Sequence, residues 1–231
     1  DVDPGDRIES LNPANPSEVV GTVASATPEI AEDAIDAAWD AFPQWSSISA
    51  EARARTIQRL VAILRRRKYE FSAWQTFEAS KNYLEAEADV AEAIDFCDFY
   101  ARQAIKMAEP LPVTPWPGED NESHLIPLGV GVVIPPWNFP LAILAGMTIG
   151  PVAAGNTVVL KPASTTPVIG AQFMEAVEEA GFPPGVINFL PGPGSRVGDT
   201  LVDHPRTRFI NFTGSKEVGL RIAERSAKVN P

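Results

Sequence analysis

Residues 129–140 read GVGVVIPPWNFP, and they decide the fold because a short apolar run ends abruptly at two prolines. The run at 129–134 has the apolar, β-branched composition of a buried strand. Pro135 and Pro136 lack the N–H group that a sheet ladder needs, so the strand must stop there. The sequence therefore predicts that an amide side chain, Asn138, lies just beyond the end of a strand.

A second apolar run, Thr157–Leu160, ends in the same way, at Lys161 and Pro162. Open α/β sheets bind their ligands beyond the carboxyl ends of their strands. We therefore expect two neighbouring strand ends, one carrying a neutral hydrogen-bond donor and the other a cation.

The second half of the chain alternates short apolar runs with helical periodicity, which predicts βαβ units and a parallel, mostly buried sheet. The predicted strands are residues 123–127, 129–134, 157–160, 186–190 and 208–212. The predicted helices of this half are residues 141–153, 166–180, 194–202 and 215–227. The chain ends after a helix, where the alternation would supply another strand, so we expect an incomplete sheet.

The first half of the chain has the periodicity of helices, and we predict no strand in it. Its predicted helices are residues 28–41, 49–68, 69–80 and 87–108, with Thr27 as the N-cap of the first. Four prolines and a glycine make residues 110–121 an extended connector. The predicted domains are a helical part of the cofactor-binding domain (1–110), a connector and arm (111–128) and a Rossmann-like core (129–231).

Composition narrows the function classes. The chain has 231 residues, 45% hydrophobic and 21% charged, as in an ordinary globular protein. Its single cysteine excludes an internal disulfide framework and, with no signal pattern at the start, favours the cytoplasm. The net charge of −11 argues against nucleic acid as a partner. Residues 125–160 carry no charge, but prolines and glycines break them into pieces too short to span a membrane.

Four motifs in register resemble the aldehyde dehydrogenase superfamily over roughly residues 10–230. They are Pro136-Trp137-Asn138-Phe139-Pro140, Lys161-Pro162-Ala163, Pro191-Gly192-Pro193-Gly194 and Phe212-Thr213-Gly214-Ser215. Within the superfamily, residues 80–86 and 91–96 are most similar to 1-pyrroline-5-carboxylate (glutamate semialdehyde) dehydrogenases. The resemblance implies NAD(P)-dependent oxidation of an aldehyde to a carboxylate, with glutamate semialdehyde, an intermediate of proline breakdown, as the expected substrate.

The resemblance also implies which residues hold the cofactor. The cleft would be lined by Ile134, Pro135, Pro136, Trp137 and Ala163. Phe212, Thr213, Gly214 and Ser215 would approach the nicotinamide and pyrophosphate. Gly194 and Gly198 would lie by the adenosine half and Val218 near the adenine. Taken alone, each glycine-containing segment is better interpreted as a simple turn, because neither matches the dinucleotide fingerprint.

Lys161 and Ser164 bear on the choice between NAD and NADP. By resemblance, Lys161 bonds ribose hydroxyls. Many NAD-preferring relatives have a glutamate at the position of Ser164, and that glutamate repels the 2′-phosphate of NADP. A neutral serine predicts NAD as the cofactor, with detectable use of NADP.

Asn138 is the one catalytic residue that the sequence supplies, since a fixed amide can stabilise the oxyanion formed during aldehyde oxidation. The structural alternative is a cap for the helix that opens at Pro140. Cys97 lies on an apolar helix face, which indicates a core residue and not a nucleophile. Glu85 and Phe139 are the candidate substrate contacts, and a helix-start carboxylate is an equal alternative for Glu85.

The catalytic cysteine and general-base glutamate of the superfamily have no counterpart here, so the catalytic domain is expected to be absent and the chain inactive alone. A truncated, non-catalytic nucleotide-binding module stays open as an alternative. So do a dehydrogenase for another aldehyde, such as succinate semialdehyde, and an acyl-phosphate reductase. Residues 121–128 resemble the superfamily's oligomerisation arm, which predicts a dimer or larger assembly. The isolated His124 and His204 predict no metal site.

Overall fold

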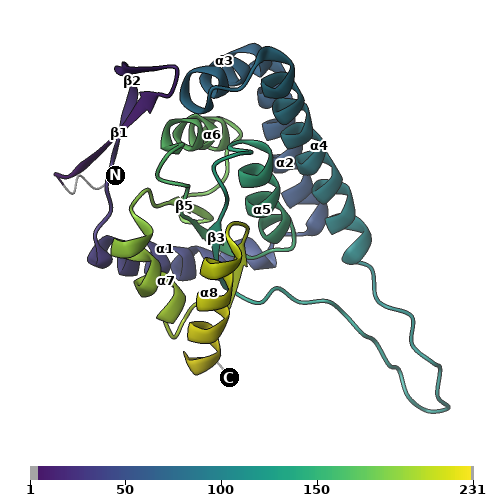
Figure 1. Cartoon of the computed structure of the whole chain (residues 1–231). Coiled ribbons are helices and arrows are strands. Elements are labelled where there is room, and N and C mark those ends of the chain that lie inside the picture. Colours follow the sequence, from purple (N-terminus) through teal and green to yellow (C-terminus); the bar gives the residue numbers. More distant parts are fainter. Residues whose placement is uncertain (1–4, 230–231) are drawn as a thin grey trace.

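The computed structural model describes residues 5–229, so the outer limits of the predicted domains, residues 1 and 231, lie outside the described residues. Helices and strands follow one another in the order drawn in Figure 1. In chain order they are β1 (Arg7–Asn12), β2 (Asn15–Ala24), α1 (Pro28–Ser47), α2 (Ala50–Arg66), α3 (Lys68–Ala79), α4 (Tyr83–Met107), β3 (Val130–Ile134), α5 (Ala142–Ala153), β4 (Thr157–Leu160), α6 (Pro167–Glu179), β5 (Ile187–Phe189), the π-helical turn η1 (Gly194–Gly198), α7 (Asp199–Asp203), β6 (Phe209–Phe212) and α8 (Lys216–Val229).

A four-stranded parallel sheet in the order β5-β4-β3-β6 forms the centre of the molecule. The predicted α/β architecture with a parallel sheet is therefore confirmed. Alternate residues of each strand point to opposite faces, so Val130 and Val132 enter one apolar cluster and Val133 enters the other. Both faces are buried, which explains why these strands read as nearly continuous apolar runs.

The helices form layers around this sheet. One face is covered by α1, whose Ala31, Ile35 and Ala38 pack with the strands. The other face is covered by α5 and α6, and α2, α3 and α4 pack outside them (Figure 1). Close contact between α4 and α5 depends on Gly146 and Gly150, since a Cβ at Gly146 would lie 3.0 Å from the Phe96 ring. The sheet ends are thus held between two rigid helical layers.

Helix α1 begins as predicted, with the Thr27 side chain accepting a hydrogen bond from the N–H of Ile30 at 3.4 Å. Its predicted end at residue 41 is wrong, because the helix continues through Pro43 to Ser47. The last turn is held by tertiary packing, since the buried Trp45 donates from Nε1 to the carbonyl of Val152 at 2.9 Å. Packing of this kind overrides the local tendency of proline to end a helix.

Three further features differ from the sequence-based expectation. The antiparallel hairpin of β1 and β2 was not anticipated, because its strands are half exposed and show little apolar alternation. The predicted helix at 194–202 is instead the turn η1 followed by the short helix α7. The predicted strand at 123–127 is wrong, since only an isolated bridge between Leu111 and Ser123 forms there.

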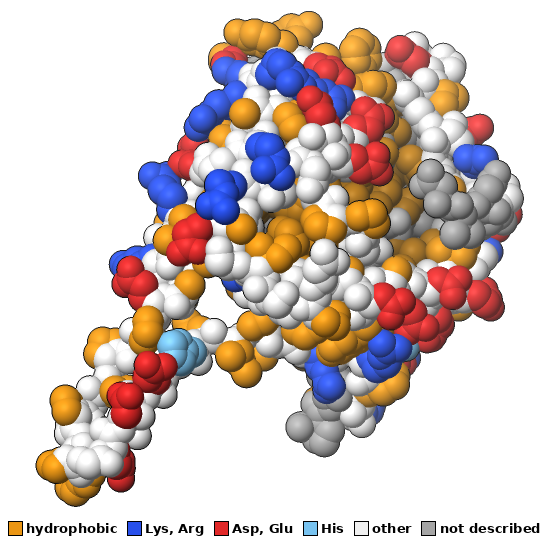
Figure 2. All heavy atoms as spheres, turned by 180° about the vertical axis from the view of Figure 1, so that it is seen from behind, with side chains coloured by type: hydrophobic (Ala, Val, Ile, Leu, Met, Phe, Trp, Pro, Cys, Tyr) orange, Lys and Arg blue, Asp and Glu red, His pale blue; other side chains and the backbone are white. Residues whose placement is uncertain are grey.

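The segment between α4 and β3, residues 108–129, extends away from the body as a long loop (Figure 1). Figure 2 shows hydrophobic side chains spread along it, together with acidic ones. Trp116, Leu125 and Ile126 are among its exposed apolar residues. Residues 110–121 form no helix or strand, as predicted for an extended connector, and the one bridge in the described part of the arm joins its own residues Leu111 and Ser123.

Candidate functional site

The ends of β3 and β4 lie side by side, as the sequence predicts. The two strands are parallel neighbours with Val133 opposite Leu160, and the N–H of Lys161 donates to the carbonyl of Val133 at 2.9 Å. The loop that carries Asn138 and the turn that carries Lys161 therefore leave the same edge of one sheet. Two strand ends that are adjacent in space form the crevice in which sheets of this kind bind ligands.

Strand β6 brings a third segment to this edge. It pairs with β3 so that Phe212 lies opposite Ile134, and the N–H of Thr213 donates to the carbonyl of Ile134 at 3.2 Å. Helix α8 starts immediately afterwards, and the Ser215 hydroxyl accepts from the N–H of Val218 at 3.3 Å. The first N–H groups of a helix favour anions, so this helix end is suited to a phosphate group.

A hollow of about 540 Å³ lies between these segments. Its lining consists of residues that the sequence predicted for the cofactor, together with Asn138. They are Ile134, Pro135, Pro136, Trp137, Asn138, Ala163, Phe212, Thr213, Gly214, Ser215 and Val218. Packing within the protein requires a glycine at position 214, because a Cβ there would lie 2.7 Å from the Phe212 ring.

Four other predicted cofactor residues lie outside this lining. The Lys161 side chain is buried, and its Nζ donates to the carbonyl of Pro162 at 3.1 Å. Burial lowers the pKa of Lys161 to about 8, and no carboxylate of residues 5–229 pairs with it. A buried cation without a counter-charge is costly in the free protein. A bound molecule that accepted hydrogen bonds from this ammonium would offset that cost.

Ser164, Gly194 and Gly198 lie on the β4 side of the edge. The Ser164 hydroxyl donates to the carbonyl of Gly192 at 3.3 Å, which links the β4 turn to the segment after β5. A Cβ at Gly194 or Gly198 would meet no heavy atom of residues 5–229 within 4 Å. The protein's own packing does not require glycine at either position, and the open space there would admit a ligand close to the backbone.

Asn138 is exposed and makes no hydrogen bond with any residue of the described range 5–229. The alternative that Asn138 caps the following helix is wrong, because α5 begins only at Ala142 and receives no cap from its own N-cap residue, Leu141. That cap comes from a distant residue, since the Asp89 carboxylate accepts from the N–H of Ala142 at 2.7 Å. The Asn138 amide is thus free to donate outward.

A second hollow, of about 370 Å³, lies on the other side of the Asn138 loop. Glu85 and Phe139, the two predicted substrate contacts, both line it, together with Trp137 and Asn138. Glu85 is also in the first turn of α4, where the Asn82 side chain caps its N–H at 3.0 Å, so both interpretations of Glu85 agree with its position. Asn138 therefore stands at the boundary between two hollows.

Three charged residues of this second hollow were missed by the sequence reasoning: Lys81, Asp89 and Glu92. Asp89 and Glu92 follow Glu85 at helical spacing, so all three carboxylates lie on one face of α4. Helical spacing from Glu85 could have identified them. Burial raises the pKa of the Asp89 carboxyl, while its ion pair with Lys81 acts in the opposite direction.

Cys97 is a core residue, as predicted. It is completely buried between helices, and burial raises its pKa to about 12. The reactive form of cysteine is the thiolate, so this thiol is inert at neutral pH.

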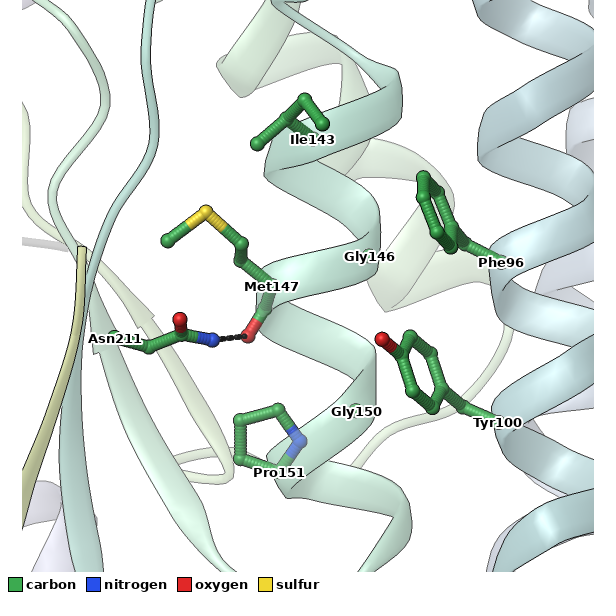
Figure 3. A pocket seen from close by; sticks show the side chains of 8 residues that line it. All are labelled: Phe96, Tyr100, Ile143, Gly146, Met147, Gly150, Pro151 and Asn211. Atoms are coloured by element: carbon green, nitrogen blue, oxygen red, sulfur yellow. Dashed lines mark hydrogen bonds between the residues drawn. The ribbon is translucent and has the colours of Figure 1, made fainter. Parts of the chain in front are cut away.

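A separate hollow of about 320 Å³ between α4, α5 and β6 contains none of the predicted site residues (Figure 3). Its main polar contact is the bond from the Asn211 amide to the carbonyl of Met147, at 3.1 Å.

In residues 5–229, no group of three or more His, Cys, Asp or Glu side chains is placed to hold a metal ion. Over the same residues, no helix combines the length and apolar character of a membrane span.

Comparison with known proteins agrees with this geometry. The model of the aldehyde dehydrogenase family matches residues 2–230. The chain belongs to the aldehyde dehydrogenase family. The 1-pyrroline-5-carboxylate dehydrogenase of Geobacillus kaustophilus is 59% identical over 226 residues, which cover 98% of this chain and 44% of that protein. The chain thus spans less than half the length of this relative.

Two solved structures superimpose closely on the chain. The 1-pyrroline-5-carboxylate dehydrogenase from Thermus with bound NAD is 57% identical, with a TM-score of 0.96, and the match covers 97% of this chain and 44% of that one. Proline utilization A from Bdellovibrio bacteriovorus is 44% identical, with a TM-score of 0.97, and the match covers 100% and 24% of the two chains. The predicted family, and the similarity to 1-pyrroline-5-carboxylate dehydrogenases in particular, are confirmed.

Proposed function

We propose that this chain is the cofactor-binding part of an NAD(P)-dependent aldehyde dehydrogenase that oxidises L-glutamate 5-semialdehyde to glutamate in proline degradation. The observation that carries the proposal is the position of Asn138, whose unpaired amide lies between a hollow suited to a dinucleotide and a hollow lined by carboxylates. Family membership and the names of the relatives support the same reaction.

The residues present suit a nicotinamide dinucleotide. The start of α8 offers N–H groups to the pyrophosphate, and the open backbone at Gly194 and Gly198 leaves room for the adenosine half. Lys161 would donate to ribose hydroxyls, in place of the Pro162 carbonyl that it now contacts. When bound, the nicotinamide serves as hydride acceptor. The neutral Ser164 favours NAD, with NADP also accepted.

Asn138 would stabilise the negative charge that develops on the aldehyde oxygen. The N–H₂ group of its amide is a hydrogen-bond donor that does not ionise, so it can donate to an oxyanion at any physiological pH. Glu85 and Glu92 place negative charge beside the same loop, which suits a substrate that carries an ammonium group. Phe139 would contact the apolar stem of the substrate.

The nucleophile and the general base would be supplied by the part of the protein that lies outside this chain. The three-part domain division stays part of the proposal, as do a cytoplasmic location and inactivity of the chain alone.

We further propose that the arm at 111–128 joins neighbouring subunits into a homo-oligomer. Its exposed Trp116, Leu125 and Ile126 support this, because apolar side chains on an extended segment gain stability from a partner surface.

A panel of substrates tests the proposal in the full-length protein. Turnover of glutamate semialdehyde is compared with turnover of succinate semialdehyde and acetaldehyde, each with NAD and with NADP. We expect the highest kcat/KM for glutamate semialdehyde with NAD, and a measurable rate with NADP. A higher kcat/KM for succinate semialdehyde would assign another substrate, and binding of NAD with no turnover of any aldehyde would favour the non-catalytic module.

A further inference from the structure

A buried ion pair between Lys81 and Asp89 lies directly beneath the loop that carries Asn138. We propose that these two are positioning residues, which hold Asn138 in the orientation that the reaction requires. The proposal rests on the proposed function, since it deepens the role given there to Asn138. Neither residue was identified from the sequence, and neither needs to contact the reacting atoms.

Asp89 holds the far end of the loop. It is 1% exposed, and its Oδ1 accepts from the N–H of Ala142 at 2.7 Å, at the first residue of α5. Leu141, the N-cap residue of α5, supplies no side-chain cap, so the carboxylate takes over this function from a different helix. Through this bond, α4 determines where the Asn138 loop ends.

Lys81 holds the middle of the loop. Its ammonium pairs with the second oxygen of Asp89 and lies 4.3 Å from the centre of the Phe139 ring. A cation over an aromatic face is attracted to it, most strongly where water is excluded, and the Lys81 side chain is only 11% exposed. Phe139 is the direct neighbour of Asn138, so fixing the ring restricts the backbone on one side of the amide.

Asn138 depends on these contacts because it has few of its own. Its side chain is exposed and makes no hydrogen bond within residues 5–229. The start of the loop is fixed by the sheet through the carbonyl of Ile134, and its later part is fixed through Phe139 and Ala142. Without these two contacts, the loop after Asn138 would be held only by the packing of the buried Leu141 and Ala142 at the start of α5, and the Phe139 ring beside the amide would lose its cation.

The local backbone also presents Lys81 to this place. Ser80 ends α3 in the left-handed conformation, with φ of 53°, and Asn82 caps α4 two residues later. A left-handed serine is uncommon, and here it turns the chain so that Lys81 faces the loop between two helices.

Glu78 offers a matched control. It is another buried carboxylate that caps a helix, α6, by accepting from the N–H groups of Val168 and Ile169 at 2.8 Å each. Within residues 5–229 no Lys or Arg forms an ion pair with it, and it does not line either hollow of the site. Loss of Glu78 should therefore disturb packing without moving Asn138.

The experiment measures aldehyde oxidation by the full-length protein in four variants: Lys81→Met, Lys81→Arg, Asp89→Asn and Glu78→Gln. We expect kcat to fall at least tenfold in Lys81→Met and Asp89→Asn, because a misplaced catalytic group costs up to about 10²-fold in rate. Lys81→Arg should stay within about threefold of the wild type and Glu78→Gln within about twofold. The dissociation constant for NAD should change by less than about twofold in all four.

Amide hydrogen exchange provides a readout that does not depend on activity. Exchange of the peptide covering residues 137–142 should become faster in Lys81→Met and stay unchanged in Glu78→Gln. The proposal is overturned if kcat of Lys81→Met or Asp89→Asn stays within twofold of the wild type, or if Glu78→Gln loses as much. A wild-type protein without aldehyde oxidation would contradict the proposed function instead, and the exchange measurement would then decide the role of Lys81.

Discussion

The end of β3 and the end of β4 are neighbours in one sheet, yet they are built in opposite ways. At the β3 end, Asn138 is exposed, neutral and without a hydrogen bond in the described chain. At the β4 end, Lys161 is buried and cationic, and its ammonium donates to the carbonyl of Pro162 without an ion pair to any carboxylate of residues 5–229. The first arrangement keeps a donor available, and the second stores an unfavourable charge that a ligand can compensate.

The helices that follow the two ends are fixed by the same device. Asp89 of α4 caps α5, and Glu78 of α3 caps α6. Only Asp89 also holds a cation, which reaches the loop of Asn138. The outer helical layer therefore caps the helix after each strand end, but only the cap at the β3 end is linked through a cation to a loop that carries a site residue.

The largest expected effect concerns the β3 end. Asn138→Ala should lower kcat of the full-length protein by about 10²–10³, since one oxyanion donor is lost. The dissociation constant for NAD should stay nearly unchanged, because Asn138 is one of eleven residues that line the cofactor hollow and its amide makes no hydrogen bond to the others. Steady-state kinetics and a fluorescence titration with NAD check the two parts, and full activity of the variant would remove Asn138 from the mechanism.

A substitution of Lys161 at the β4 end should change both the stability of the protein and its affinity for NAD. Burial lowers the folded-state pKa of Lys161 from 10.5 to about 8, so the charged form destabilises the fold at neutral pH by about 3 kcal/mol. Lys161→Met should raise the free energy of unfolding at pH 7 and weaken NAD binding about 10- to 100-fold, the usual worth of a charge-assisted hydrogen bond.

The sign of the pH dependence makes the Lys161 prediction sharper. Between pH of about 8 and 10.5 the unfolded chain binds more protons at this lysine, so the wild type gains stability as pH rises. The advantage of Lys161→Met should therefore shrink over that window in urea unfolding curves. An advantage that is constant from pH 7 to 10.5 would show that the charge is not its cause.

Glu78→Gln tests whether the two caps are equivalent in stability. The carboxylate accepts from Ser10 as well as from Val168 and Ile169, and a glutamine has only one acceptor oxygen. We expect a loss of about 1–3 kcal/mol in unfolding free energy, from the groups left unpaired. Denaturant unfolding measures it, and an unchanged midpoint would mean that the caps are dispensable.

Cys97 gives the smallest effect. It lies on α4 like Asp89, but inside the core and away from both strand ends. Cys97→Ala should cost about 1 kcal/mol in unfolding free energy and leave NAD binding unchanged. A thiol reagent should not label Cys97 in the native protein, and rapid labelling would contradict its burial.

Much of the fold follows from local pattern. The strand Thr157–Leu160 has the predicted bounds, and the other strands of the parallel sheet differ from prediction by one residue at one or both ends. Most helices differ by one to four residues, apart from α1, which is longer than predicted, and residues 194–202, which form a turn and a short helix. The errors have tertiary causes: Trp45 extends α1 beyond Pro43, and the arm lacks a partner strand. The hairpin of β1 and β2 was missed because its weak alternation is compensated by contacts such as the bond from Ser10 to Glu78.

By itself, the sequence determined that two apolar strands stop at prolines, that an amide and a lysine follow them, and that the motifs fit one family. These features are local, because proline removes a donor wherever the chain goes. Only the tertiary structure decided that Lys161 is buried, that Asn138 borders two hollows, and that Lys81 and Asp89 lie beneath its loop. Lys81 and Asp89 are only eight residues apart, but the loop that they contact lies about fifty residues further along the chain, and no local pattern encodes that meeting.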